Sequence, residues 1–125
     1  MSEIRFSHCI PFLPTANIAE TVKFYRDALA FDDLWIWDDP ATVVRVGRGP
    51  VKFLFTLDPQ HPVLQKGFDI MIFLNGVKDL YTQYSEQGLT FADPLEKKPW
   101  GLCEFCVRDN NGYFLRFGED TKKTN

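Results

Sequence analysis

The sequence contains little of what metal and redox chemistry usually requires. Its 125 residues include only two histidines and three cysteines, and these are the side chains that most often bind zinc or iron. An odd number of cysteines, together with an amino terminus that lacks an export signal, predicts free thiols and a cytoplasmic location. No apolar run approaches the roughly 20 residues that span a membrane. Lysines and arginines form no stripe and the net charge is −3, so we expect no nucleic-acid partner and no membrane partner.

Aromatic residues, by contrast, are abundant. Phenylalanine, tyrosine and tryptophan make up 15% of the chain, with 12 Phe, 4 Tyr and 3 Trp. Hydrophobic residues make up 45% and charged residues 25%, which is the composition of a folded globular domain and not of a disordered chain. At this length we expect one domain covering residues 1–125.

Apolar segments and turn signals follow one another in the same order twice. In the first half we expect, in order, a strand at Ile4–Phe12, a helix from Ile18 to Leu29, and strands at Phe31–Trp37, Thr42–Val46 and Val51–Leu57. In the second half we expect a strand at Gly67–Leu74, a helix from Val77 to Tyr84, and strands at Leu89–Phe91, Leu102–Val107 and Tyr113–Phe117. Asp58–Lys66, which contains two prolines, is the expected linker between them.

This repeat predicts an α+β fold built from two tandem βαβββ modules, at about residues 1–58 and 67–120. Asn17 is the predicted N-cap of the first helix, and Gly88 is predicted to end the second. Asp109-Asn110-Asn111-Gly112 predicts a tight turn between the last two strands. One helix can cover only one face of each mixed sheet, so the other faces are free to form a cleft.

Four short motifs carry a family resemblance. Leu13-Pro14 precedes the first helix and Phe24-Tyr25-Arg26-Asp27 lies within it, while Gln87-Gly88-Leu89 and Arg108-Asp109-Asn110-Asn111-Gly112 belong to the second half. Together with the repeat, these motifs make the chain similar to the vicinal oxygen chelate superfamily, which includes glyoxalases, extradiol dioxygenases and bleomycin resistance proteins. The fold alone does not specify a function within such a superfamily.

Enzymes of this superfamily hold a divalent ion between His and Glu side chains on their sheet faces. By the resemblance, the first-strand position falls nearest Ile10, with His8 two residues earlier on the same face, and the register between the two stays open. The later positions fall on Leu54, Asp69 and Arg116. Leucine cannot ligate, and a guanidinium puts a positive charge where the cation would sit. We therefore predict no metal, no cofactor and no catalytic residue, and for Asp69 either an ion pair with Arg116 or a polar role in lining the cleft.

Arg116, Trp100-Gly101 and Leu13-Pro14 resemble the bleomycin resistance branch in particular. The resemblance implies a domain-swapped homodimer that sequesters a planar, antibiotic-like ligand in aromatic clefts between its subunits. The residues that we expect to bind this ligand are Trp35, Trp37, Phe55, Trp100, Asp69 and Arg116.

Acidic residues flank the two tryptophans of one predicted strand. Asp32-Asp33 precedes them and Asp38-Asp39 follows them. Indole rings stack on flat heteroaromatic groups, and nearby carboxylates would complement a positive charge on such a ligand. The sequence therefore favours a planar cation as the ligand.

Two other functions stay open at this stage. A metal-dependent lyase or dioxygenase would use a non-standard ligand set of His8, Asp69 and Glu104. A module that keeps the fold only for dimerisation would use Trp35 and Trp37 as interface residues. The two cysteines of the Cys103–Cys106 segment are three residues apart on a predicted strand, so they point to opposite faces and do not form a metal-binding pair.

Overall fold

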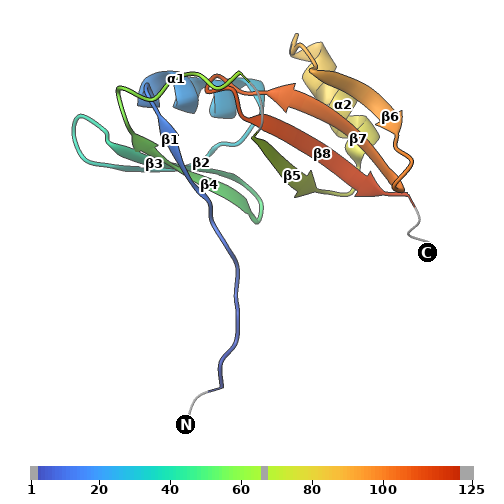
Figure 1. Ribbon diagram of the computed structural model, residues 1–125, viewed down its shortest axis with the longest axis horizontal. Coiled ribbons are helices and arrows are strands. Elements are labelled where there is room, and N and C mark those ends of the chain that lie inside the picture. The colour runs from blue at the N-terminus through green and yellow to red at the C-terminus, as the bar shows by residue number, and fades with distance from the viewer. Residues whose placement is uncertain (1–2, 66–67, 122–125) are drawn as a thin grey trace.

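The computed structural model describes residues 3–65 and 68–121, which form two βαβββ modules that lie side by side (Figure 1). Module 1 contains β1 (Phe12–Thr15), α1 (Ile18–Lys23), a π-helical turn η1 (Phe24–Ala28), β2 (Asp33–Trp37), β3 (Val43–Arg48) and β4 (Val51–Leu57). Module 2 contains β5 (Asp69–Phe73), α2 (Val77–Glu86), β6 (Asp93–Lys97), β7 (Leu102–Arg108) and β8 (Phe114–Asp120).

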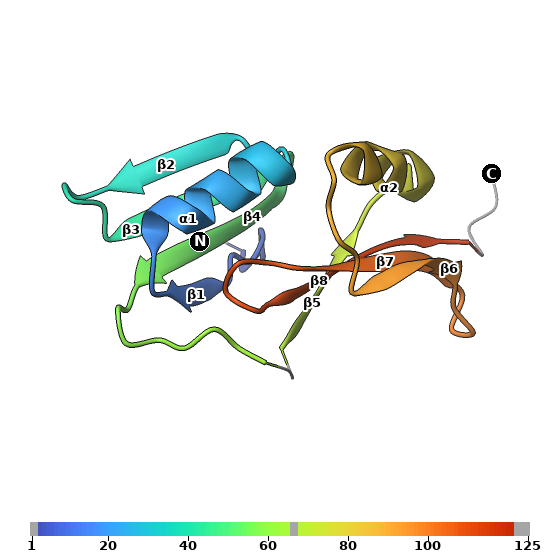
Figure 2. The same cartoon turned by 90° about the horizontal axis from the view of Figure 1, so that it is seen from above.

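The two modules have the same strand order. Sheet A runs β1-β4-β3-β2 and sheet B runs β5-β8-β7-β6. β1 pairs with β4 and β5 pairs with β8 in parallel, whereas the other neighbours are antiparallel. The predicted α+β fold of two tandem βαβββ modules with mixed sheets is therefore confirmed. Figure 2 shows α1 over sheet A and α2 over sheet B. We call the uncovered side of each sheet its open face.

Local signals fix the ends of the helices as predicted. Asn17 is the N-cap of α1, and its side-chain oxygen accepts a hydrogen bond from the Glu20 amide at 3.0 Å. Gly88 lies just beyond α2 with a φ of 83°, a left-handed conformation that glycine adopts without steric cost. Asp109 begins the β7–β8 turn, where its carbonyl accepts a hydrogen bond from the Gly112 amide at 3.1 Å.

Two buried tyrosines join the modules. Tyr25, on the turn after α1, donates its hydroxyl proton to the Asp109 carboxylate of module 2 at 2.5 Å. Tyr84, on α2, donates to the Leu29 carbonyl of module 1 at 2.8 Å. Both rings are fully buried within one core that spans both modules. Each helical segment is therefore tied to the opposite module through a tyrosine hydroxyl.

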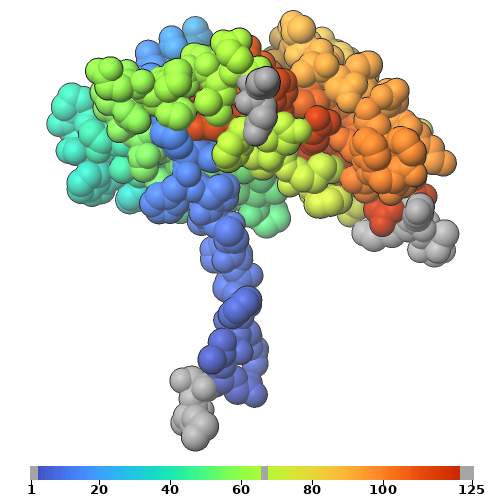
Figure 3. Space-filling view, in the orientation of Figure 1, coloured from blue at the N-terminus to red at the C-terminus, as the bar shows by residue number. Residues whose placement is uncertain are grey.

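The predicted strand at Ile4–Phe12 is wrong, because β1 begins only at Phe12. Its last ladder contact on the amino-terminal side is the hydrogen bond from the Leu54 amide to the Pro11 carbonyl at 3.0 Å. Residues 3–11, which we call the arm, run away from the body of the molecule (Figures 1 and 3). Within the described residues no neighbouring strand pairs with the arm beyond Pro11, so it has no partner to make it a strand.

The predicted strand at Leu89–Phe91 is also wrong. β6 begins at Asp93, and the Phe91 ring packs on the Tyr81 ring of α2 with centroids 4.4 Å apart. These apolar residues cover the helix instead of pairing in the sheet.

Among the described residues, no helix is both long enough and apolar enough to cross a membrane.

Candidate ligand-binding faces

The open face of sheet A carries two tryptophans. Residues alternate between the two faces along β2, so Trp35 and Trp37 point to the same side. Ile36 points to the other side, where it lines a shallow groove with Val22 of α1. The two indoles are 45% and 55% exposed. Trp35 and Trp37 therefore form an open aromatic surface, as predicted.

One carboxylate on the same face as these tryptophans is already paired. Asp33 accepts a hydrogen bond from Lys52 Nζ at 2.9 Å and lies 3.5 Å from Arg45 Nη2. The hydrogen bond from Lys52 lowers the pKa of Asp33 below its usual range. Asp38 closes the β2–β3 turn, where it accepts hydrogen bonds from the Asp39 amide and the Thr42 hydroxyl. Asp33 is therefore neutralised by cations and does not supply the free negative charge that we expected from the sequence, whereas the neutral donors to Asp38 leave its charge in place.

The open face of sheet B carries a charged cluster beneath the third tryptophan. Arg116 Nε donates to Asp69 at 2.7 Å, which confirms the predicted ion pair, and Arg116 Nη1 lies 3.5 Å from Glu104. Arg116 and Cys106 are register partners on neighbouring strands, so both stand on this face. Trp100, in the β6–β7 turn, donates its indole N–H to Glu104 at 2.8 Å.

Glu104 is the member of this cluster whose role the sequence did not reveal. Its side chain is 2% exposed, whereas Trp100 above it is 60% exposed. A buried carboxylate of this kind needs hydrogen bonds and a cation, and Trp100 and Arg116 provide them. Glu104 therefore positions the Trp100 indole. The four-residue spacing across a turn gives no pattern from which this contact could be predicted.

Phe55 does not lie on an open face. Its side chain is fully buried between sheet A and the helical layer, where it contacts the rings of Tyr25 and Tyr113. Leu54, its neighbour on β4, is the residue that stands on the open face, in register with Arg45. We correct the sequence-based assignment accordingly and leave Phe55 out of the proposed site.

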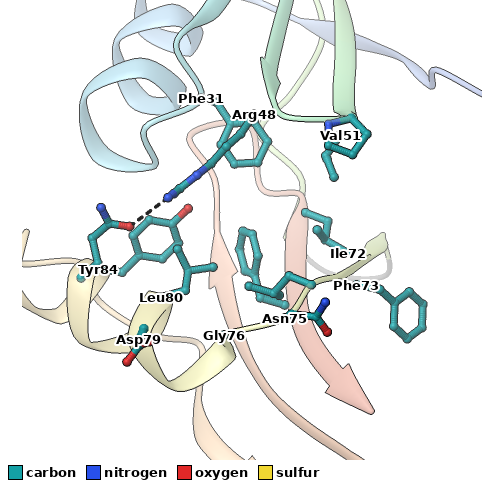
Figure 4. Close-up of a pocket in the computed structure, with 14 residues that line it drawn as sticks. Phe31, Arg48, Val51, Ile72, Phe73, Asn75, Gly76, Asp79, Leu80 and Tyr84 are labelled. Carbon is teal, nitrogen blue, oxygen red and sulfur yellow. Dashed lines mark hydrogen bonds between the residues drawn. The ribbon is translucent and has the colours of Figure 1, made fainter. Parts of the chain in front are cut away.

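A pocket of about 650 Å³ lies at the junction of the two modules, lined by both (Figure 4). Phe31 and Val51 contribute from module 1, and Ile72 and Leu80 contribute from module 2. Arg48 reaches across it, but its guanidinium already donates to the Leu29 carbonyl at 3.2 Å and to Gln83 at 3.3 Å. None of the residues that we predicted as ligand-binding lines this pocket.

These faces can now be compared with known proteins. The family model described as the Glyoxalase/Bleomycin resistance protein/Dioxygenase superfamily matches residues 5–117. The chain belongs to this superfamily. No curated protein sequence gives a significant match.

Several solved structures are similar in fold to this chain. The bleomycin-binding protein of Streptomyces verticillus, complexed with copper(II)-bleomycin, is 22% identical with a TM-score of 0.74, covering 92% of this chain and 97% of that one. The bleomycin resistance determinant of transposon Tn5 is 20% identical with a TM-score of 0.75, covering 92% and 98%. TioX from Micromonospora is 19% identical with a TM-score of 0.74, covering 92% and 99%. At these identities the comparison shows the shared fold.

The residues that the sequence suggested as possible metal ligands do not fit a divalent ion. Asp69 and Glu104 both face the Arg116 guanidinium, which occupies the place of a cation. His8 lies on the exposed arm, where its Nδ1 contacts the Ser7 hydroxyl, and Ile10 lies on the same arm. Within residues 3–65 and 68–121, no three His, Cys, Asp or Glu side chains come together as a metal site.

The cysteines are free thiols in three different environments. Cys9 is exposed on the arm, Cys103 is half-buried and Cys106 is buried. The register of β7 with β8 puts Cys103 and Cys106 on opposite faces, as predicted. Burial raises the pKa of the Cys106 thiol to about 11, so this thiol is protonated and unreactive at neutral pH.

Proposed function

We propose that this protein binds a planar aromatic small molecule on its open sheet faces, in the manner of the bleomycin-binding proteins that it resembles in fold. The observation that supports this function is the placement of its indoles. Trp35, Trp37 and Trp100 are all exposed on, or at the edge of, the open faces, while the tyrosines Tyr25, Tyr84 and Tyr113 are buried in the core. Exposed aromatic side chains that share a sheet face favour a binding site there.

The two open faces offer complementary parts of such a site. The face of sheet A supplies Trp35 and Trp37, and the face of sheet B supplies Trp100 over the cluster of Asp69, Glu104 and Arg116. The fixed indole of Trp100 is suited to stack on a flat ring, since its orientation is held by a hydrogen bond. A cleft between subunits would combine the two faces.

We infer that the protein forms a homodimer through the arm. Ile4 and Phe6 are 92% and 95% exposed, and large apolar side chains at that exposure favour a partner. Edge strands β1 and β5 are unpaired on one side, and Phe12 and Phe73 on them are exposed. Pairing of the arm with an edge strand of a second copy would cover both the arm and the edge.

Titration with metal-free bleomycin tests the binding function. We expect saturable quenching of tryptophan fluorescence, weakened at least tenfold in the Trp35→Ala variant. Ile36→Ala is the matched control, because Ile36 is similarly exposed on the same strand but points away from the open face. Absence of quenching by bleomycin or by other planar heteroaromatic compounds would contradict the proposal.

Sedimentation equilibrium on the full chain tests the dimer. We expect a dimer for the native sequence and a monomer for the double variant Ile4→Ser, Phe6→Ser, whose arm can no longer bury apolar surface. A monomeric native protein at micromolar concentration would overturn the dimer without affecting the binding proposal.

A further inference from the structure

Arg45 stands in the middle of the open face of sheet A. The strand register puts Trp35 of β2 on one side of it and Leu54 of β4 on the other. Its side chain is about one-third exposed. A guanidinium therefore lies directly beside one of the two exposed indoles, on the surface to which the proposed function assigns the ligand.

The charges on this part of the face leave one cation in excess. Asp33 and Lys52 are in register with Gly47, so both lie on the same face as Arg45. Lys52 and Arg45 share the single Asp33 carboxylate, at 2.9 Å and 3.5 Å. Two cations against one carboxylate give this group a formal charge of +1, and Lys52 holds the closer contact with Asp33.

Arg45 also has a donor without an acceptor. Its Nε is shielded from solvent and has no hydrogen-bond partner within the described part of the chain. The guanidinium carries five N–H donors in a planar fork that matches the two oxygens of a carboxylate, and its Nη2 lies 3.5 Å from Asp33. A ligand carboxylate that approaches the solvent-exposed part of the Arg45 side chain would balance the excess charge. The shielded Nε becomes available to it only if the Arg45 side chain turns outward.

We propose that the ligand of this face is a flat aromatic carboxylate, whose ring stacks on the Trp35 indole and whose carboxylate binds Arg45. This inference rests on the proposed function and specifies its ligand class. It differs from the planar cation that the flanking acids suggested, because Asp33, the acid beside Arg45, is neutralised by its two partners, whereas Asp38 lies beyond the other end of β2.

The open face of sheet B has the opposite balance. There Asp69 and Glu104 share the single cation Arg116, which gives the cluster a formal charge of −1. An aromatic acid is therefore expected to bind near Trp35 and Trp37 and not near Trp100. The three tryptophans of the chain make this distinction measurable, since each indole N–H gives its own resonance.

The test compares three probes that share one ring system and differ in charge: 2-naphthoate, neutral 2-naphthamide and 2-naphthylmethylammonium. Indole resonances of the ¹⁵N-labelled full chain are assigned with Trp→Phe variants and followed during titration. We expect 2-naphthoate to shift Trp35 and Trp37 with a Kd at least tenfold below that of the amide, and the ammonium probe to bind most weakly.

Substitution of Arg45 identifies the charge responsible. Arg45→Gln is expected to raise the Kd for 2-naphthoate at least tenfold, to the Kd of 2-naphthamide. Arg45→Lys keeps the positive charge but not the fork, so its Kd for 2-naphthoate should lie between those of the native protein and Arg45→Gln. Arg26→Gln is the matched control, because Arg26 is paired with Asp27 on the helical layer, and it should leave the Kd unchanged.

The outcomes separate the two proposals. Stronger binding of the amide or the ammonium probe at Trp35 would overturn the carboxylate inference and leave the binding function standing. An unchanged Kd in Arg45→Gln would also overturn it. If none of the three probes shifts any indole resonance, the carboxylate inference fails, and the bleomycin titration decides the proposed function separately.

Discussion

At the scale of single residues, the buried Glu104 carboxylate has Arg116 as its cationic partner. Arg116 and the Trp100 indole are the groups that compensate this carboxylate within the described chain. Removing one partner of a buried ion pair leaves an uncompensated charge, which typically costs 3–5 kcal/mol. Arg116 is itself one-third exposed, so the lower end of that range applies.

We therefore predict that Arg116→Leu lowers the free energy of unfolding by about 3 kcal/mol, as measured by urea denaturation. The double variant Arg116→Leu, Glu104→Leu should recover most of this loss, because the buried charge is gone. Asp69→Asn is the control, since that half-exposed partner of Arg116 should cost at most about 1 kcal/mol. Equal losses in Arg116→Leu and Asp69→Asn would contradict this reading of Glu104.

At the scale of elements, the β7–β8 turn is held against the linker between the modules. Gly112 has a φ of 90°, and a Cβ on it would lie 2.1 Å from the Leu64 carbonyl oxygen. The Leu64 amide in turn donates to the Asn111 carbonyl at 2.9 Å. The turn and the linker therefore approach each other at a distance that only glycine allows.

Gly112→Ala should therefore be strongly destabilising, by about 3 kcal/mol or more in urea denaturation, since it combines backbone strain with a clash against the main chain. Gly49→Ala is the matched control. Gly49 also has a positive φ, of 58°, but no atom lies within 4 Å of its would-be Cβ, so only the strain of about 1 kcal/mol applies. A similar loss in both variants would show that the close approach is unimportant.

Structural elements that depend on a local sequence signal were predicted correctly. Elements that depend on a partner distant in the sequence were not. The turn at Asp109 and the cap at Asn17 are local, and both are present. The arm has the apolar pattern of a strand, but a strand needs a neighbour, which the sequence of one chain does not show. Phe55 was assigned to the wrong face because β4 is apolar on both faces near it, so its alternation gives no direction.

At the scale of the whole molecule, the two modules should unfold together. Their cores form one cluster, and Tyr25 and Tyr84 each bond to the opposite module. Cooperative unfolding of a small domain gives coincident transitions for all probes. Trp35 and Trp37 report on module 1 and Trp100 on module 2, so the chain carries its own reporters.

Two variants isolate the reporters: Trp100→Phe leaves only the tryptophans of module 1, and the double variant Trp35→Phe, Trp37→Phe leaves only that of module 2. For each variant, the urea midpoint from tryptophan fluorescence is compared with the midpoint from far-UV circular dichroism at the same protein concentration. We predict that the difference between these two midpoints is zero for both variants. A fluorescence transition that precedes the dichroism transition would mean that the reporting module unfolds by itself.

Three buried tyrosines, the two that join the modules and Tyr113, also shape how the protein responds to base. Burial raises the pKa of Tyr84 and of Tyr113 to about 12 and that of Tyr25 well above its ordinary value, whereas a tyrosine in the unfolded chain ionises near pH 10. Above pH 10 the unfolded chain therefore loses phenolic protons that the folded one retains, and stability falls as the pH rises toward 12. The hydroxyls that hold the two modules together at neutral pH should thus make alkaline unfolding abrupt. The phenolate absorbance of these three tyrosines near 295 nm should rise together with loss of structure.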